Sequence, residues 1–236
     1  MVGALDDGLG RRVRGLYVGG SLASRDFRPG VSDIDAVALV DRPPDPSTRG
    51  GLTTLHRRLR SEPFGSDLHC AYVSERHVED AAYRHWTWAF DELFRRPFGG
   101  IARAELLTDP VVVRGPAPSS WLGAMSPDDL RAAARDELAG YWTTAVRRRT
   151  IWRQDVYVDH GLTTVARAAI TVREGRLVTK AEAIAHLPEL GVAPDIVEGV
   201  RRRRNGEPVT LTAGERDTRA RVVRDVVRTQ ITRLVG

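Results

Sequence analysis

The chain has 236 residues, of which 42% are hydrophobic and 28% are charged, and it carries a formal net charge of +5 with a pI of about 9.9. This length accommodates one large domain or two modest domains, each with a core of its own. No apolar run is long enough to span a membrane or is flanked as a signal peptide would be, so we expect a cytoplasmic protein without a membrane partner. The single cysteine, Cys70, excludes an internal disulfide and fits a reducing compartment.

The positive charge of the chain comes almost entirely from arginine. Of the 36 basic residues only Lys180 is a lysine, a skew more typical of a GC-rich coding sequence than of selection for phosphate binding. The runs Arg147–Arg149 and Arg201–Arg204 lie in polar, helix-like stretches, which favours solvated surfaces over a nucleic-acid groove. We therefore do not expect nucleic acid as a partner, and a monomer is the favoured state.

The N-terminal half alternates short β-like runs with turns and helical pieces. We expect strands at 15–19, 36–40 and 68–73, a helix over about 48–60, and a short strand or connector at 111–113. The prolines at 43, 44 and 46 end the second of these strands, because proline cannot donate to a β-ladder. The sequence thus predicts an α/β domain at 1–116, which ends at Gly115-Pro116.

The C-terminal half has helical periodicity throughout. Ser126-Pro127 followed by two aspartates is a typical helix start, and Gly175 is a typical residue to end a later helix that contains Leu162 and Ile170. Further amphipathic stretches cover roughly 179–186, 194–204 and 213–234. We expect residues 117–236 to form a bundle of about five helices, so the chain as a whole belongs to the α+β class.

Two aspartates mark the most informative position in the chain. Asp33 and Asp35 lie two residues apart at the start of a hydrophobic strand, so they share one face of it. Like charges on one face of a strand repel each other, and a divalent cation such as magnesium relieves that repulsion. The alternative for the pair alone is a turn aspartate followed by a solvated aspartate at the strand start.

The segment before these aspartates favours the metal site. Gly19-Gly20-Ser21 follows an apolar strand and opens a short helix, where bare backbone amides and a hydroxyl can cradle phosphate. A tight turn at 29–32 then returns the chain as a strand beside the first one. The whole string, GGSLASRDFRPGVSDIDAVALV, resembles the signature of the DNA polymerase beta-like nucleotidyltransferase superfamily.

This resemblance implies roles for individual residues. Gly20 and Ser21 would bind the phosphates of ATP, and Asp33 and Asp35 would ligate two magnesium ions. A third carboxylate from a later strand would act as general base or further ligand, and Asp67, which opens the run Asp67–Val73, is the first candidate. His69 shares the face of Asp67 by the period of two and is the second candidate, although relatives would carry a glutamate there.

The C-terminal half resembles the helical domain of streptomycin and spectinomycin adenylyltransferases. The resemblance rests on a Leu-Thr-Thr-Val-Ala-Arg run at 162–167, on Gly175-Arg176-Leu177-Val178-Thr179-Lys180, and on a Val-Arg-Gly-Pro linker at 113–116. It implies that Lys180 reaches the phosphates of ATP and that the segment before Leu162 holds an aminoglycoside. In that segment the candidate substrate contacts are Trp152, Asp155 and Asp159, and the alternative for each is a helix-capping or core role.

The resemblance as a whole implies magnesium-dependent transfer of AMP from ATP to a hydroxyl of an aminoglycoside-type antibiotic, with release of pyrophosphate. One alternative keeps this chemistry and changes the acceptor to a tRNA, a protein or another small metabolite. A different alternative is a non-catalytic module that binds nucleotide.

Overall fold

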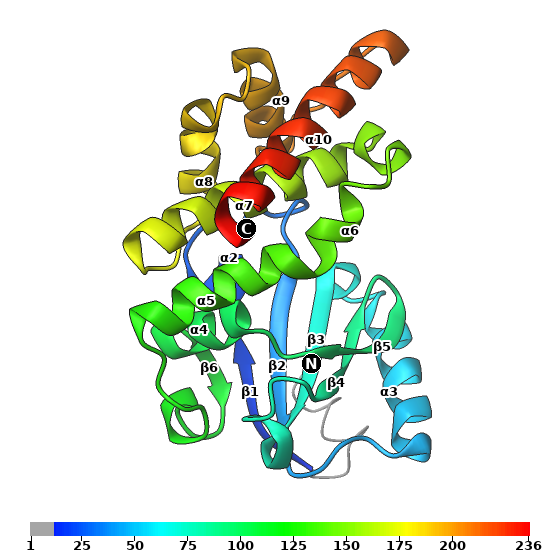
Figure 1. The fold of residues 1–236 in the computed structure, drawn as a ribbon. Coiled ribbons are helices and arrows are strands. Elements are labelled where there is room, and N and C mark those ends of the chain that lie inside the picture. The colour runs from blue at the N-terminus through cyan, green and yellow to red at the C-terminus, as the bar shows by residue number, and fades with distance from the viewer. Residues whose placement is uncertain (1–11) are drawn as a thin grey trace. The chain divides into compact units, whose positions relative to one another are not determined.

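The first unit of the chain is built around one mixed β-sheet (Figure 1). The computed structural model describes residues 12–236, and within these residues six strands form the sheet in the order β5-β4-β3-β2-β1-β6. β2 and β3 pair in parallel, and the other neighbouring strands pair antiparallel. The strands are β1 Val13–Val18, β2 Ile34–Val40, β3 Leu68–Ser74, β4 Arg84–Ala89, β5 Glu92–Pro97 and β6 Val111–Arg114.

Four of these strands lie where the sequence predicts them, whereas the β4–β5 hairpin was not predicted. Its residues mix arginines with aromatic side chains, so the alternation of apolar and polar residues that indicates a strand is weak there. β5 is an edge strand whose residues are mostly exposed, which explains why charged residues are tolerated in it.

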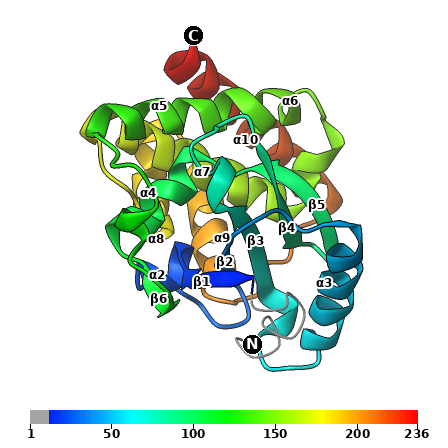
Figure 2. The ribbon, with the colours of Figure 1, turned by 90° about the horizontal axis from the view of Figure 1, so that it is seen from below.

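Helices pack on both faces of the sheet. α3, Pro46–Leu59, begins at Asp45, whose side chain accepts a hydrogen bond from the Thr48 amide, and it buries Leu52 against one face together with Ala36 and Ala38 of β2. The alternate β2 residues Val37 and Leu39 pack on the opposite face with Leu106 of α4, Gly100–Thr108. Figure 2 shows α3 beside β5, with β6 at the other edge of the sheet. Burial on both sides explains why β2 reads as a continuous apolar run.

Within the described residues the first compact unit ends at Ala124 and the second covers Met125–Gly236, whereas the sequence places the domain boundary after residue 116. Residues 117–124 lie with the first unit because their side chains join its core. Leu122 belongs to the cluster around Tyr17, and the indole of Trp121 donates to the Tyr17 hydroxyl at 3.2 Å.

The second unit is helical, as predicted. Its first long helix begins at Ser126, which caps it with Asp129 in a reciprocal pair of hydrogen bonds, and Pro127 occupies the first helical position. Gly175 ends α7 with a left-handed backbone, φ +68°. The helices are α5 Pro127–Glu137, α6 Thr143–Ala145, α7 Asp155–Glu174, α8 Lys180–His186, α9 Pro194–Arg204 and α10 Ala213–Val235.

A π-helical turn at Leu138–Trp142 connects α5 to α6. Across residues 12–236 each helix is either too short or too polar to cross a membrane.

Candidate functional site

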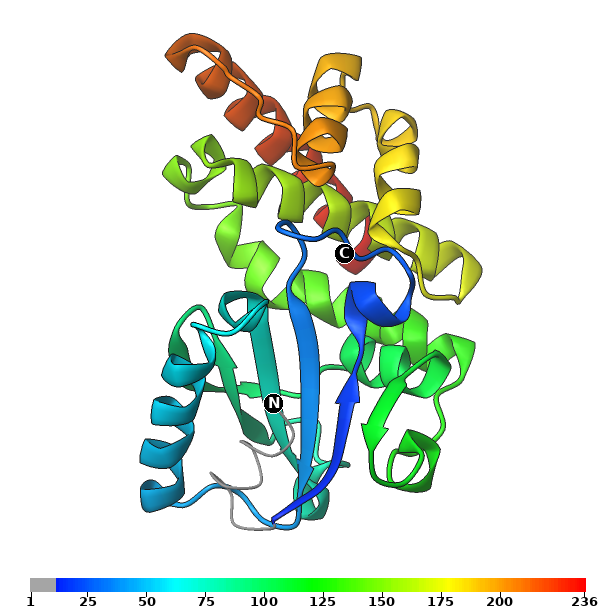
Figure 3. The same cartoon turned by 180° about the vertical axis from the view of Figure 1, so that it is seen from behind.

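The turn after β1 packs directly against Asp35. α2, Gly20–Ala23, follows β1 at once, as Figure 3 shows, and the Gly19 amide donates to the Asp35 carbonyl at 2.9 Å. Gly20 has a left-handed backbone, φ +59°, and a Cβ added there would overlap the Oδ2 atom of Asp35. Only glycine therefore allows this turn to approach the carboxylate so closely. Ser21 comes next and is partly buried at the start of α2.

Asp33 and Asp35 present their carboxylates on the two sides of one imidazole. β2 and β3 pair in a register that sets Asp35 beside His69. Nε2 of His69 lies 3.8 Å from Oδ1 of Asp33, and its Nδ1 lies 3.9 Å from Oδ1 of Asp35. The side chains of the two aspartates remain 45% and 50% exposed, whereas that of His69 is 14% exposed. The structure thus brings together two accessible carboxylates and one largely enclosed ring.

Asp67, the first candidate for a general base, lies in a 3₁₀ turn at Gly65–Asp67 that leads into β3. Its Oδ1 accepts a hydrogen bond from the Ser66 hydroxyl at 3.0 Å. His69, the second candidate, lies within 4 Å of both Asp33 and Asp35. The histidine thus lies beside the paired carboxylates, and the choice of general base between Asp67 and His69 stays open.

Two residues near the site were missed because they belong to the β4–β5 hairpin. Phe90, in the hairpin turn, contacts His69 edge-on with ring centroids 5.0 Å apart. Arg96 lies on β5. Desolvation lowers the pKa of its guanidinium, and the negative charge of Asp35 partly offsets that shift. A positively charged group within electrostatic reach of Asp35 could also act on a bound phosphate.

The donor set suits a hard cation that takes part of its ligands from elsewhere. Across residues 12–236 no three His, Cys, Asp or Glu side chains are grouped so as to hold a metal ion by themselves. Asp33 and Asp35 supply two carboxylates, and magnesium is commonly held by one or two carboxylates plus phosphate oxygens and water. The exposure of both carboxylates leaves room for such ligands.

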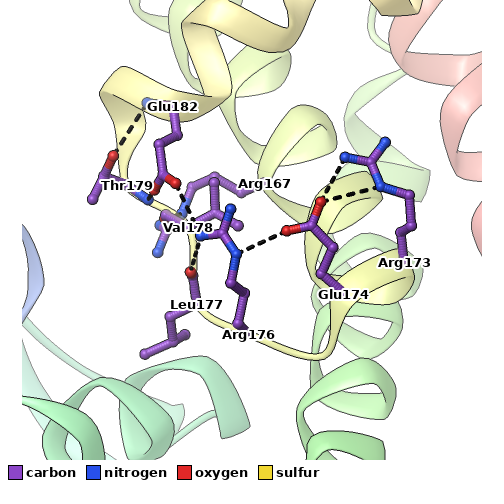
Figure 4. A network of polar contacts seen from close by, with 8 residues as sticks. All are labelled: Arg167, Arg173, Glu174, Arg176, Leu177, Val178, Thr179 and Glu182. Atoms are coloured by element: carbon purple, nitrogen blue, oxygen red, sulfur yellow. Dashed lines mark hydrogen bonds and ion pairs between the residues drawn. The ribbon is translucent and has the colours of Figure 1, made fainter.

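Lys180 is the first residue of α8 and is partly buried. Thr179 caps this helix by accepting a hydrogen bond from the Glu182 amide, and Figure 4 shows Arg176 bridging Glu182 and Glu174 beside it. Arg167 of α7 donates to the Val178 carbonyl at 2.7 Å and so fixes the loop before the cap. The start of α8, and with it the backbone of Lys180, is thereby held by several polar contacts.

Trp152, expected to contact a substrate, is instead a core residue of the second unit. Its side chain is 0% exposed, its Nε1 donates to the Ala145 carbonyl at 3.1 Å, and its ring packs against Trp142 at 6.1 Å. A Cβ on Gly161 of α7 would lie only 2.6 Å from the Trp152 ring. A ring enclosed in this way offers no surface to a ligand, so the structure favours the core role of Trp152 over a contact with a substrate.

Asp155 and Asp159 lie one turn apart on α7 and are both paired with arginines from later helices. Arg203 of α9 binds Asp159 through two nitrogens, at 2.8 and 2.6 Å, and Nη1 of Arg219 on α10 lies 2.6 Å from Asp155. Desolvation raises the pKa of Asp159, and the Arg203 guanidinium opposes that shift. The structure thus uses these carboxylates to tie α7 to α9 and α10, a role that the sequence did not indicate.

Comparisons with protein-family models and with curated proteins give no match for this chain. Among solved structures it is similar to a spectinomycin adenyltransferase from Enterococcus faecialis, which was crystallised with ATP and spectinomycin. The TM-score is 0.73 over 96% of both chains, at 15% sequence identity. At this identity the likeness establishes a shared fold, and it confirms the α+β fold expected from the resemblance.

Proposed function

We propose that this protein is a nucleotidyltransferase that transfers AMP from ATP to a hydroxyl group of an aminoglycoside-type acceptor such as streptomycin or spectinomycin, releasing pyrophosphate. The observation that carries the proposal is the pair of exposed carboxylates, Asp33 and Asp35, with the Gly20 turn packed against Asp35. The shared fold supports it, because the solved neighbour is named as an adenyltransferase.

Magnesium is the cofactor that this proposal requires. Asp33 and Asp35 would hold two ions, which supply charge stabilisation to the phosphates when bound. The fit rests on two features: the exposed oxygen donors of both aspartates, and the absence of a side chain at Gly20, where a Cβ would displace Asp35.

Different residues of the chain would carry out the separate parts of nucleotidyl transfer. The Gly20 and Ser21 turn and the Lys180 ammonium would bind the triphosphate and stabilise the departing pyrophosphate. The proton of the attacking hydroxyl would pass to His69 or Asp67. The position of His69 supports this role, because its ring lies within 4 Å of both Asp33 and Asp35. Correct positioning supplies much of the rate in reactions of this class.

A second acceptor class is supported by the ion pairs on α7. An aminoglycoside is a polycation and would be recognised by carboxylates, but Asp155 and Asp159 are already neutralised by Arg219 and Arg203. A contact with the acceptor stays a prediction for these two aspartates, and a cation would have to displace a guanidinium to reach them. A hydroxyl acceptor of lower positive charge, such as a small metabolite, is therefore the second candidate.

The test is pyrophosphate release with ATP, magnesium and a panel that contains streptomycin, spectinomycin and neutral polyols. We expect Asp35→Asn to lower kcat by about a thousandfold or more, since it removes a ligand charge at the reacting phosphate, with little change in the unfolding midpoint. Asp195→Asn, at an exposed position in the first turn of α9, is the matched control and should retain activity. Activity retained by Asp35→Asn would refute the metal site, and magnesium-dependent ATP binding without turnover of any acceptor would indicate a non-catalytic module.

A further inference from the structure

The turn of the β4–β5 hairpin holds an exposed aromatic ring in an unfavourable backbone conformation. Ala89 pairs with Glu92, so Phe90 and Asp91 form a two-residue loop, and their φ angles are +53° and +63°. Turns of this kind strongly favour asparagine and glycine, because other side chains strain the left-handed backbone. Phe90 is nevertheless 78% exposed, so burial of its ring does not compensate for the strain.

The turn is contacted from both sides. Arg60 Nη1, just after α3, lies 2.8 Å from Oδ2 of Asp91. The ring of Phe90 meets the ring of His69 edge-on, with centroids 5.0 Å apart and an interplanar angle of 61°. Through His69 the exposed ring is connected to Asp33 and Asp35. Strained residues that persist in a defined position commonly lie at functional sites.

The order of the strands indicates which reactant would meet Phe90. The Gly20 turn follows β1 and packs on Asp35 from that side, while His69 and Phe90 lie on the β3 and β4 side of the same aspartate. In phosphoryl transfer the attacking and leaving oxygens lie roughly in line on opposite sides of the phosphorus. If pyrophosphate leaves toward the Gly20 turn, the acceptor hydroxyl must arrive from the side of His69 and Phe90.

We propose that Phe90 is a specificity-determining residue that forms an apolar wall of the acceptor site, against which a ring-shaped acceptor bearing hydroxyl groups packs one face. Binding sites for small molecules are lined mainly by apolar and aromatic side chains, with a few polar groups that orient the ligand. The inference rests on the proposed function, since the direction of attack follows from nucleotidyl transfer.

The experiment compares Phe90→Gly with the matched control Phe64→Gly. Phe64 is also left-handed, φ +62°, and 50% exposed, but its ring contacts Phe27. Glycine relieves the backbone strain at either position, and this relief offsets its entropic cost, so both variants should fold. We expect Phe90→Gly to raise the KM of the acceptor about tenfold while the KM of ATP is unchanged. Phe90→Tyr keeps an aromatic ring and should have the acceptor KM of the wild type.

The outcomes separate this inference from the proposed function. An unchanged acceptor KM in Phe90→Gly, or an equal rise in Phe64→Gly, would overturn the inference alone. If the wild type modifies neither streptomycin, spectinomycin nor a neutral polyol, the proposed function fails. Calorimetric binding of the same acceptors in the presence of ATP then decides the role of Phe90: a tenfold weaker affinity in Phe90→Gly supports it, and equal affinity or no binding by the wild type overturns it.

Discussion

Replacing Gly20 by alanine should disable the site while leaving the fold largely intact. Gly20 adopts φ +59°, and a Cβ there would overlap Oδ2 of Asp35 and lie 3.1 Å from its Cγ. Gly30 offers a matched control in the turn before β2, because it adopts φ +75° but a Cβ there meets nothing within 4 Å. Both substitutions place alanine in the left-handed region, and only Gly20→Ala meets a side chain of the site.

The magnitudes follow from these two contributions. The left-handed backbone should cost each variant about 1–2 kcal/mol of unfolding free energy. In Gly20→Ala the Asp35 carboxylate must also move by about 1 Å to restore van der Waals contact, and a displacement of this size at a reacting centre costs about a hundredfold in rate. We therefore expect similar losses of stability but very different losses of kcat.

Urea unfolding and pyrophosphate release measure the two quantities separately. The expected result is a comparable fall in midpoint for Gly20→Ala and Gly30→Ala, with kcat reduced about a hundredfold in the first and within about threefold of the wild type in the second. The reasoning is refuted if Gly20→Ala retains kcat, or if Gly30→Ala loses as much, because the clash with Asp35 would then have no specific effect.

Two further predictions concern stability. Gly161→Ala should lower the free energy of unfolding by about 2 kcal/mol or more, because its Cβ would lie 2.6 Å from the buried Trp152 ring. The control Gly50→Ala in α3 meets nothing within 4 Å and should be neutral or stabilising. A smaller loss for Gly161→Ala in urea unfolding would contradict the packing described. Burial lowers the pKa of both His56 and His85 to about 4. Between pH 6.5 and pH 4 the unfolded state therefore binds protons that the folded state does not. The free energy of unfolding should decrease as the pH falls through this window, by up to about 3 kcal/mol per histidine. Unfolding midpoints measured from pH 7 to pH 4 check this, and a flat profile would show that the rings are not held neutral.

Much of the fold could be read from local patterns. Caps, turns and periodicities depend on residues that are close together in the chain and have direct physical causes. This applies to the β2 strand, to the helix start at Pro127 and to the helix end at Gly175. The β4–β5 hairpin could not be read this way. Its edge strand β5 is mostly exposed and does not need the apolar alternation that marks a half-buried strand, and arginine and histidine precede the apolar residues of β4. The residues of that hairpin that lie near the site, Phe90 and Arg96, were missed for the same reason.

The sequence by itself determined that two aspartates share one face of a strand and that a glycine-rich turn precedes them, because a period of two and a short connection leave little freedom. Only the tertiary structure decided what surrounds them. The parallel register of β2 and β3 sets His69 beside Asp35, and register depends on pairing between segments more than thirty residues apart.

The same holds for the second unit. The resemblance implies that a tryptophan and two aspartates before Leu162 contact a ligand. In the structure, packing encloses Trp152, and arginines from α9 and α10 pair with Asp159 and Asp155. A local sequence pattern does not predict which distant arginine will pair with a carboxylate, because any guanidinium that the fold brings close can stabilise a buried carboxylate. The sequence therefore shows which residue types stand before Leu162, and only the folded structure decides which of their side chains are accessible to a ligand.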